Sequence, residues 1–235
     1  MYVVSCEHGG NRIPTGLHQV FSTRAAQRAL TSHRGWDPGA LGVARVVARL
    51  LSVRLHATAI SRLVVDTNRS LHHPRLFSEF TRSLGRSDRA QILKRHYWPH
   101  RTNVERSVVT RDSAMGPTVH IAVHSFTPWL RGRDRRFDIG LLYDPARRHE
   151  RRLALQWKRE LRLGRPGLRV RLNQPYRGAA DGLATYLRRR YDDQAYVGFE
   201  LELSQAYLAT QRARAVAGML TCTIERIVGL YAFTD

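Results

Sequence analysis

Short apolar, β-branched segments alternate along this chain with longer stretches of helical periodicity. Such alternation favours a mostly parallel sheet that is covered by helices on both faces. With 235 residues, 43% of them hydrophobic, the chain can build the core of one such domain. We therefore predict an α/β fold and a single domain over residues 1–235. The expected strands cover 2–6, 53–60, 63–66, 119–123, 138–143, 168–172 and 196–203, and the expected helices cover 37–51, 87–109, 149–163 and 206–231.

Local signals mark some of these elements individually. Asp37 stands where the N-cap of the first long helix is expected, and Pro38 falls at the first helical position. We expect the helix over 87–109 to be interrupted at Pro99. The arginine-rich segment 131–136 is the loop that we expect to be most mobile.

The charge of the chain is strongly positive, at +20 with a sequence pI near 11.3. Such values are typical of nucleic-acid-binding proteins. However, Lys94 and Lys158 are the only lysines among the 39 basic residues. Lysine neutralises phosphate as well as arginine does, so this imbalance indicates codon bias rather than selection for nucleic acid. We expect a small anionic substrate, drawn in by the positive potential, and no nucleic-acid partner.

Cysteine content and hydropathy indicate the compartment. Cys6 and Cys222 are too few for a disulfide framework, and alternation along the first strand should bury Cys6 as a packing residue. The N-terminal sequence MYVVSCEHGG lacks the basic and apolar regions of a signal peptide. No segment approaches the run of about 18 apolar residues that spans a bilayer. We expect a cytoplasmic protein without membrane association.

Residues with useful chemistry gather near the ends of the expected strands. His8 comes just after the first strand, His124 ends the strand over 119–123, and Glu200 and Glu202 lie on the last strand. A further group, Asp66 to Arg69, follows the strand over 63–66. In open α/β sheets, functional groups collect where strands end and loops begin. We therefore expect these residues to converge on one cleft.

Each of these residues also has a structural interpretation. A lone histidine in a turn, such as His8, is more often hydrogen-bonded than catalytic, and Asp66 can simply pair with an arginine. By contrast, His124 ends an apolar strand before a turn, which is typical of a metal ligand. The pair Asn68-Arg69 suits recognition of a carboxylate, because the guanidinium donates two parallel hydrogen bonds and the amide adds another.

The remaining candidates differ in how strongly they indicate function. Glu200 and Glu202 face the same side of an apolar strand, where a carboxylate is costly, and this favours a functional role. The histidine pair 72–73 and the His-Tyr-Trp-Pro-His run over 96–100 are alternatives for a second metal site or a base-stacking patch. We interpret both as helix-end and packing features.

Taken together, the motifs resemble those of a known family. The runs SCEHGGNRIP, WDPGA, SRLVVDTNRS, HSFTP, NQPY and GFELEL occur in the order expected of the N-formylglutamate amidohydrolases, from Val4 to about Gln205. The DxNR element also resembles that of the aspartoacylases and zinc carboxypeptidases. The resemblance implies a three-layer α/β sandwich around a mixed, mostly parallel sheet. It also implies one catalytic zinc ion, an Asn-Arg pair for the substrate carboxylate and a glutamate general base.

The resemblance implies a role for each matching residue. His8 and His124 match the metal-binding histidines. Related enzymes place a glutamate ligand three residues after the first histidine, but Asn11 stands there in this chain. We therefore choose Asp37 as the third ligand, with Glu7 as the fallback. The other implied roles are substrate binding by Asn68 and Arg69, further substrate contacts by Arg62 and Asn173, and general-base catalysis by Glu200, with Glu202 as its rival.

The resulting hypothesis is a zinc-dependent amidohydrolase. It would cleave N-formyl-L-glutamate, or a related N-acyl amino acid, to the free amino acid and formate or another carboxylate. One alternative is a zinc peptidase or carboxypeptidase-like hydrolase that uses the same residues on a peptide. The other is an arginine-rich nucleic-acid-binding protein on a degenerate hydrolase scaffold, which would bind more weakly as salt rises.

Overall fold

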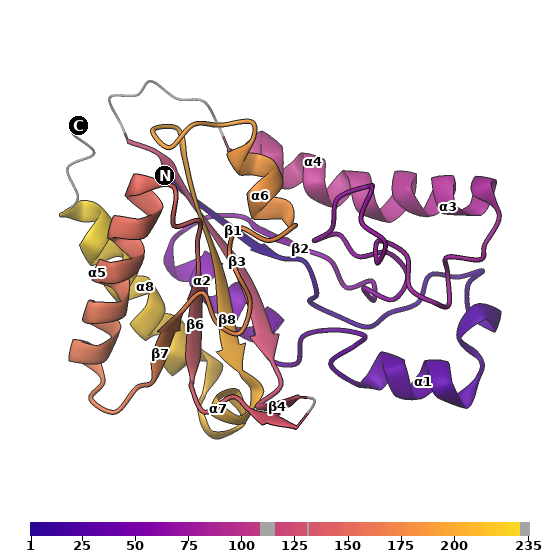
Figure 1. Ribbon diagram of the computed structural model, residues 1–235, viewed down its shortest axis with the longest axis horizontal. Helices are drawn as coiled ribbons and strands as arrows, with labels where there is room; N and C mark the ends of the chain where they lie inside the picture. The colour runs from indigo at the N-terminus through magenta and orange to yellow at the C-terminus, as the bar shows by residue number, and fades with distance from the viewer. Residues whose placement is uncertain (109–115, 131, 231–235) are drawn as a thin grey trace.

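A six-stranded sheet forms the centre of the molecule in the computed structural model, which describes residues 1–108, 116–130 and 132–230 (Figure 1). Its strand order is β2-β1-β3-β8-β6-β7. Neighbouring strands run parallel except for β6 and β8, which pair antiparallel. The strands are β1 (Tyr2–Cys6), β2 (Leu55–Ala57), β3 (Thr118–Phe126), β6 (Ile139–Leu142), β7 (Val170–Leu172) and β8 (Tyr196–Ser204).

Helices cover both faces of this sheet, which gives the predicted three-layer α/β sandwich with a mixed, mostly parallel sheet (Figure 1). The first face packs against α2 (Ala40–Leu50), α5 (Arg148–Gly164) and α8 (Ala213–Gly229). The second face packs against α4 (Trp98–Ser107) and α6 (Leu183–Arg188). A short helix, α7 (Gln205–Thr210), connects β8 to α8.

Alternation along the two central strands separates the core from the polar groups. On β3 and β8 the odd-numbered residues, such as Val123 and Leu201, enter the main hydrophobic core under α2, α5 and α8. The even-numbered residues, including His124, Glu200 and Glu202, therefore point to the opposite face, as the period of two in a strand requires. The register pairs His124 with Glu202, so the imidazole and the carboxylate lie side by side.

A second, smaller core lies beyond the edge of the sheet, on the right of Figure 1. Phe21, Leu30 and Tyr97 are buried there together with Val64. The elements around it are η1 (Gln19–Phe21), α1 (Arg24–Thr31), α3 (Arg86–Ile92) and the π-helical segment η2 (Leu93–Tyr97), which continues into α4.

Several local expectations were wrong. Residues 63–66 form a turn rather than a strand, because Val64 and Val65 pack into the second core instead of pairing in the sheet. The helical run 86–107 continues through Pro99, which lies in the first turn of α4, where a missing N–H costs little. The expected closing helix is broken between α7 and α8.

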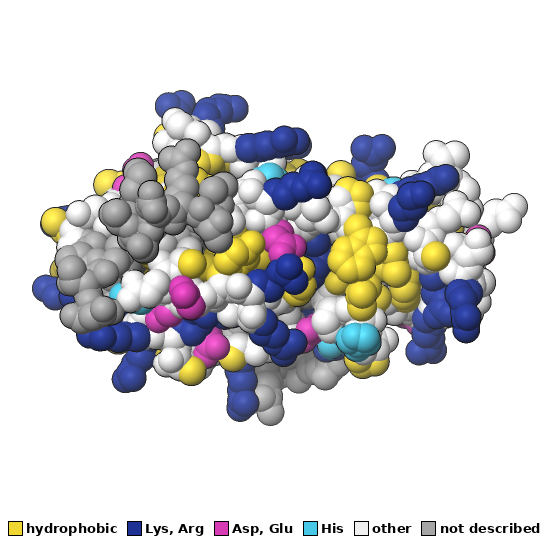
Figure 2. All heavy atoms as spheres, turned by 90° about the horizontal axis from the view of Figure 1, so that it is seen from above, with side chains coloured by type: hydrophobic (Ala, Val, Ile, Leu, Met, Phe, Trp, Pro, Cys, Tyr) yellow, Lys and Arg dark blue, Asp and Glu magenta, His cyan; other side chains and the backbone are white. Residues whose placement is uncertain are grey.

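The remaining differences concern the loops. Where a mobile loop was expected, the short strands β4 (Trp129–Leu130) and β5 (Arg133–Asp134) pair antiparallel; Arg131 lies outside the described residues, as do Val109 and Tyr231 of the expected helices. Within the part of the chain that the structure describes, no helix is long and apolar enough to cross a bilayer. Figure 2 shows that lysine and arginine side chains are spread over the visible face and do not form a single stripe.

A buried ion pair joins α5 and α6 to the start of β8. Nε of Arg188 lies 2.9 and 3.1 Å from the two carboxylate oxygens of Glu150. The same guanidinium donates to the carbonyls of Gly178 (2.6 Å) and Gly198 (2.9 Å), and Gly198 N donates back to Glu150 (3.0 Å). Every partner of this pair is inside the protein, so removing one member would leave the other charged and buried.

We therefore expect Glu150→Gln to lower the free energy of unfolding by about 3–5 kcal/mol, the usual cost of stranding a buried charge. Urea denaturation followed by circular dichroism measures the change. The pair of exposed Arg190 and half-buried Glu105 provides the control, because Arg190→Gln should cost less than about 1 kcal/mol. Equal losses in the two variants would show that the buried pair has no special role.

Candidate metal centre and active site

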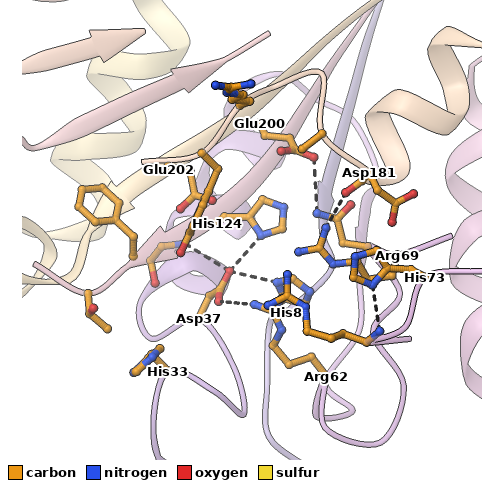
Figure 3. Close-up of a pocket in the computed structure, with 18 of the residues that line it drawn as sticks. His8, His33, Asp37, Arg62, Arg69, His73, His124, Asp181, Glu200 and Glu202 are labelled. Carbon is orange, nitrogen blue, oxygen red and sulfur yellow. Dashed lines mark hydrogen bonds and ion pairs between the residues drawn. The ribbon is translucent and has the colours of Figure 1, made fainter. Parts of the chain in front are cut away.

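Two histidines and an aspartate meet at the carboxyl ends of β1 and β3. His8 Nδ1 lies 3.3 Å and His124 Nδ1 lies 3.0 Å from the same carboxylate oxygen of Asp37 (Figure 3). One potential ligand atom from each residue falls within 4.8 Å of the others, and all three residues are buried. Two imidazole nitrogens and a carboxylate oxygen are a donor set that zinc binds in catalytic sites, which leave a fourth position open.

The fold explains why these residues meet. β1 and β3 are parallel neighbours, so His8, just past β1, and His124, near the end of β3, lie at the same edge of the sheet. Asp37 is held beside them because its N–H donates to the carbonyl of His8 (2.9 Å). The expected N-cap role of Asp37 was wrong: Gly39, with φ 83°, is the N-cap of α2, and the Asp37 carboxylate points to the histidines.

Each histidine has a second carboxylate on its other nitrogen. His8 Nε2 lies 2.7 Å from Asp66 Oδ1, and His124 Nε2 lies 3.2 Å from Glu7 Oε2. Such outer carboxylates fix the tautomer of a metal-binding histidine and leave the opposite nitrogen, here Nδ1, free to bind. Glu7, the fallback ligand, therefore lies behind the ring of His124. Asn11 points elsewhere, because its amide donates to the carbonyl of Leu30 (3.1 Å).

The electrostatics of the three candidate ligands are strongly coupled. Burial favours neutral forms, but hydrogen bonds and charges from Asp37 and Glu7 outweigh it and hold the pKa of His124 well above its usual value. Burial also opposes ionisation of Asp37, yet His8 and His124 keep its pKa below the ordinary range. The site is thus built around buried anionic oxygens that attract positive charge, and a metal ion would supply that charge.

Glu200 and Glu202 line the cavity beside this cluster, and the cavity has a volume of about 460 Å³ (Figure 3). Glu202 is buried, and one of its carboxylate oxygens has no hydrogen-bond partner. Burial, reinforced by the charges of Asp37 and Glu200, raises the pKa of Glu202 to about 7. Glu200 is half-buried and lies 3.5 Å from the side-chain amide nitrogen of Asn68.

The predicted substrate-binding residues fall into two groups. Asn68 and Arg69 line the cavity: the amide oxygen of Asn68 accepts from Leu183 N (2.7 Å), and Arg69 Nη1 donates to the carbonyl of Asp181 (2.6 Å). Arg62 also lines it, but its guanidinium lies between Asp37 (3.7 Å) and Asp66 (2.8 Å).

Asn173 is different, since it is not among the residues that line the cavity. Its side-chain oxygen accepts hydrogen bonds from Tyr143 N (3.1 Å) and Gly178 N (3.0 Å), and its own φ is 50°. These contacts hold the turn after β7. In this structure the side chain of Asn173 thus serves the turn, and the substrate contact stays a prediction.

Sequence reasoning missed several residues of the cavity wall. Arg135 stacks over the ring of Tyr176 (5.3 Å), and its Nη1 is buried without a partner. Arg135 directly follows the short strand β5, but the sequence predicted only a loop there; the arginine-rich run around it was the available signal. Tyr176 lies in the turn after β7, where Asn173 was the predicted substrate contact instead. The other missed residues are His33, His73, Arg75, Arg177 and Asp181.

Comparisons with known proteins agree with this geometry. Residues 1–209 match the family described as N-formylglutamate amidohydrolase. No curated protein matches the chain. A solved structure, the gene product Atu2144 from Agrobacterium tumefaciens, is 27% identical with a TM-score of 0.81, over 97% of this chain and 90% of that one.

A second solved structure is an N-formylglutamate amidohydrolase from Ralstonia eutropha JMP134. It is 18% identical with a TM-score of 0.63, over 97% of this chain and 93% of that one, and so shares the fold. The family match spans most of the chain, including the metal-centre candidates, both glutamates and the Asn68-Arg69 pair. The chain belongs to the N-formylglutamate amidohydrolase family and is an enzyme of the hydrolase class.

Proposed function

We propose that this enzyme hydrolyses the amide bond of N-formyl-L-glutamate, or of a related N-acyl amino acid, in the cytoplasm. The observation that carries the proposal is the cluster in which Asp37 lies between two buried imidazoles, each supported by an outer carboxylate. This arrangement opens into a cavity that is also lined by Asp181, Glu200 and Glu202 and by several arginines.

His8, Asp37 and His124 would hold one zinc ion. Zinc in such a site polarises the amide carbonyl and lowers the pKa of a bound water toward 7. The fit rests on the donor set and on a buried, unpartnered oxygen beside it, Oε2 of Glu202.

Glu200 is our assignment for the general base. It matches the family glutamate, and its partial exposure to the cavity gives a water molecule access. In this role it takes a proton from the attacking water and passes it to the nitrogen of the departing amino acid. Glu202 is the rival, because a carboxyl with a pKa of about 7 is well matched to proton transfer at neutral pH.

Arg69 and Asn68 would hold the carboxylate of the substrate. Hydrogen bonds to Asp181 and Leu183 already fix these two side chains, so they lose little conformational entropy when the substrate binds. The positive charge of the cavity wall adds attraction for an anionic substrate, which added salt should weaken.

The metal assignment predicts the stoichiometry and its dependence on the outer carboxylates. Purified enzyme should contain about one zinc per chain, and His124→Ala should lose it. Glu7→Gln keeps all three ligands but weakens the support of His124, so zinc affinity should fall roughly 10–100-fold. Competition with a fluorescent chelator measures the affinity, with the exposed carboxylate variant Glu79→Gln as control. Wild-type protein that takes up no zinc at neutral pH would refute the assignment.

The choice between the two glutamates predicts unequal effects. Glu200→Gln should lower kcat on N-formyl-L-glutamate by roughly 10²–10⁴-fold, the typical contribution of a general base, and Glu202→Gln should have a smaller effect. Zinc content, measured in parallel, separates a lost base from a lost metal. If instead Glu202→Gln removes activity and Glu200→Gln retains it, the base is Glu202.

The role of Arg69 predicts a dependence on the substrate carboxylate. Arg69→Ala should lower kcat/KM for N-formyl-L-glutamate by roughly 10–100-fold, the cost of losing a charge-assisted hydrogen bond. An N-formyl amine without any carboxylate serves as the control, since wild type and variant should hydrolyse it equally. An unchanged kcat/KM on the acidic substrate would contradict the role.

A further inference from the structure

A second cavity, of about 240 Å³, lies between the edge strand β2 and the helical run of η2 and α4. We call it the basic cavity. Its charged and titratable wall residues are all basic: none is an aspartate or glutamate. The wall consists of Arg54, His56, Arg95, His96 and His100, together with Leu55, Ala57, Thr58, Pro99 and Asn103.

The two arginines of this cavity are not neutralised by a carboxylate of the described residues, whereas His100 lies 3.3 Å from Glu7. Neither Arg54 nor Arg95 forms an ion pair with any of the residues that the structure describes, and both are exposed. Other buried or half-buried arginines of this protein, such as Arg62 and Arg188, do have acidic partners. The two guanidinium groups therefore keep their donors available for a ligand.

The histidines show the effect of this charge. Burial, together with the charges of His100 and Arg54, lowers the pKa of His56. Burial and the charge of Arg95 lower the pKa of His96 in the same way. Burial and the neighbouring cations therefore disfavour the protonated form of both imidazoles, and an anion bound beside them would offset that effect.

A metal ion does not fit the same space. Among the described residues, the group with ligand atoms close enough to hold a metal is His8, Asp37 and His124, and none of the basic-cavity histidines belongs to it. Two guanidinium groups would also repel a cation. Arginine forks match the oxygens of phosphate and carboxylate, and a doubly charged oxyanion gains most from several cations in one cavity.

We propose that the basic cavity binds a phosphate-type oxyanion, either inorganic phosphate or the phosphate group of a small phosphomonoester. Arg54, the residue just before the edge strand β2, and Arg95, from η2, would donate hydrogen bonds to the oxygens. His96 and Asn103, on the helical run, add side-chain donors, and the cavity volume suits a compact group. This inference does not depend on the proposed hydrolysis.

One wall residue of the basic cavity, His100, contacts the carboxylate that lies behind His124 in the candidate metal centre. His100 Nε2 lies 3.3 Å from one oxygen of Glu7, and the other oxygen of Glu7 lies 3.2 Å from His124 Nε2. The anion would therefore bind on the far side of β1 from the substrate cavity, with His100 and Glu7 between the two sites.

The test is calorimetric titration of inorganic phosphate, and separately of glycerol phosphate, into the zinc-loaded enzyme. The double variant Arg54→Gln/Arg95→Gln should raise Kd at least about tenfold, which corresponds to about 1.4 kcal/mol. The matched control Arg49→Gln/Arg86→Gln removes the same charge from two exposed positions outside both cavities and should bind as wild type does. The tighter of the two titrants identifies the source of the phosphate group.

Three results would overturn the proposal. Wild-type affinity in Arg54→Gln/Arg95→Gln would exclude the basic cavity, and equal weakening in the control pair would mean that net charge alone attracts phosphate. Loss of binding in Arg69→Gln, with none in the double variant, would place phosphate in the substrate cavity. Imidazole ¹⁵N spectra provide a second readout, since phosphate should shift the signals of His56 and His96 in wild type. A hydrolysis assay on Arg54→Gln/Arg95→Gln tests the proposed function separately from phosphate binding, because neither residue lines the substrate cavity.

Discussion

The carboxylate of Asp37, shared between the imidazoles of His8 and His124, is the interaction around which the polar half of this protein is arranged. Three carboxylates, those of Asp37, Asp66 and Glu7, are buried around these two imidazoles. Burying so many anionic groups is costly unless each has a compensating charge or donor. The histidines and arginines supply part of that compensation, and a bound cation would supply more. The same groups therefore determine the stability of this edge of the sheet and form the candidate metal centre.

Strand topology turns residues that are far apart in sequence into neighbours. Because β1, β3 and β8 run parallel side by side, their carboxyl ends bring His8, His124 and Glu202 to one edge of the sheet. The antiparallel β6 then closes the other side of β8 and places Gly140 opposite Glu202. A Cβ on Gly140 would lie 2.0 Å from the carbonyl oxygen of Gln174, so only glycine lets the turn after β7 approach so closely. That turn is the one that Asn173 holds.

Six of the seven expected strands form the sheet, and the candidate residues other than Asn173 line one cavity. Alternation put Glu200 and Glu202 on one face, and it buried Cys6 in the main core. It failed for residues 63–66, because an apolar β-branched run indicates burial without saying which core buries it. Asn173 lies off the cavity wall, because its polar side chain serves a turn. Arg135 and Tyr176 reach the cavity from loops, and tertiary packing alone decides where such loops lie.

Glu202 shows how the fold gives up stability at this site. Its pKa is about 7 in the folded protein, above the ordinary value of 4.5, so the folded state binds the proton more tightly than the unfolded chain does. Stability from this group is therefore present below pH 4.5 and is lost as the pH rises toward and through 7. An apolar residue at position 202 would avoid the loss, as Leu201 and Leu203 do on the opposite face of the same strand. A carboxylate kept at this cost, with one buried oxygen unpartnered beside His124, is explained better by chemistry in the cavity than by the packing of β8.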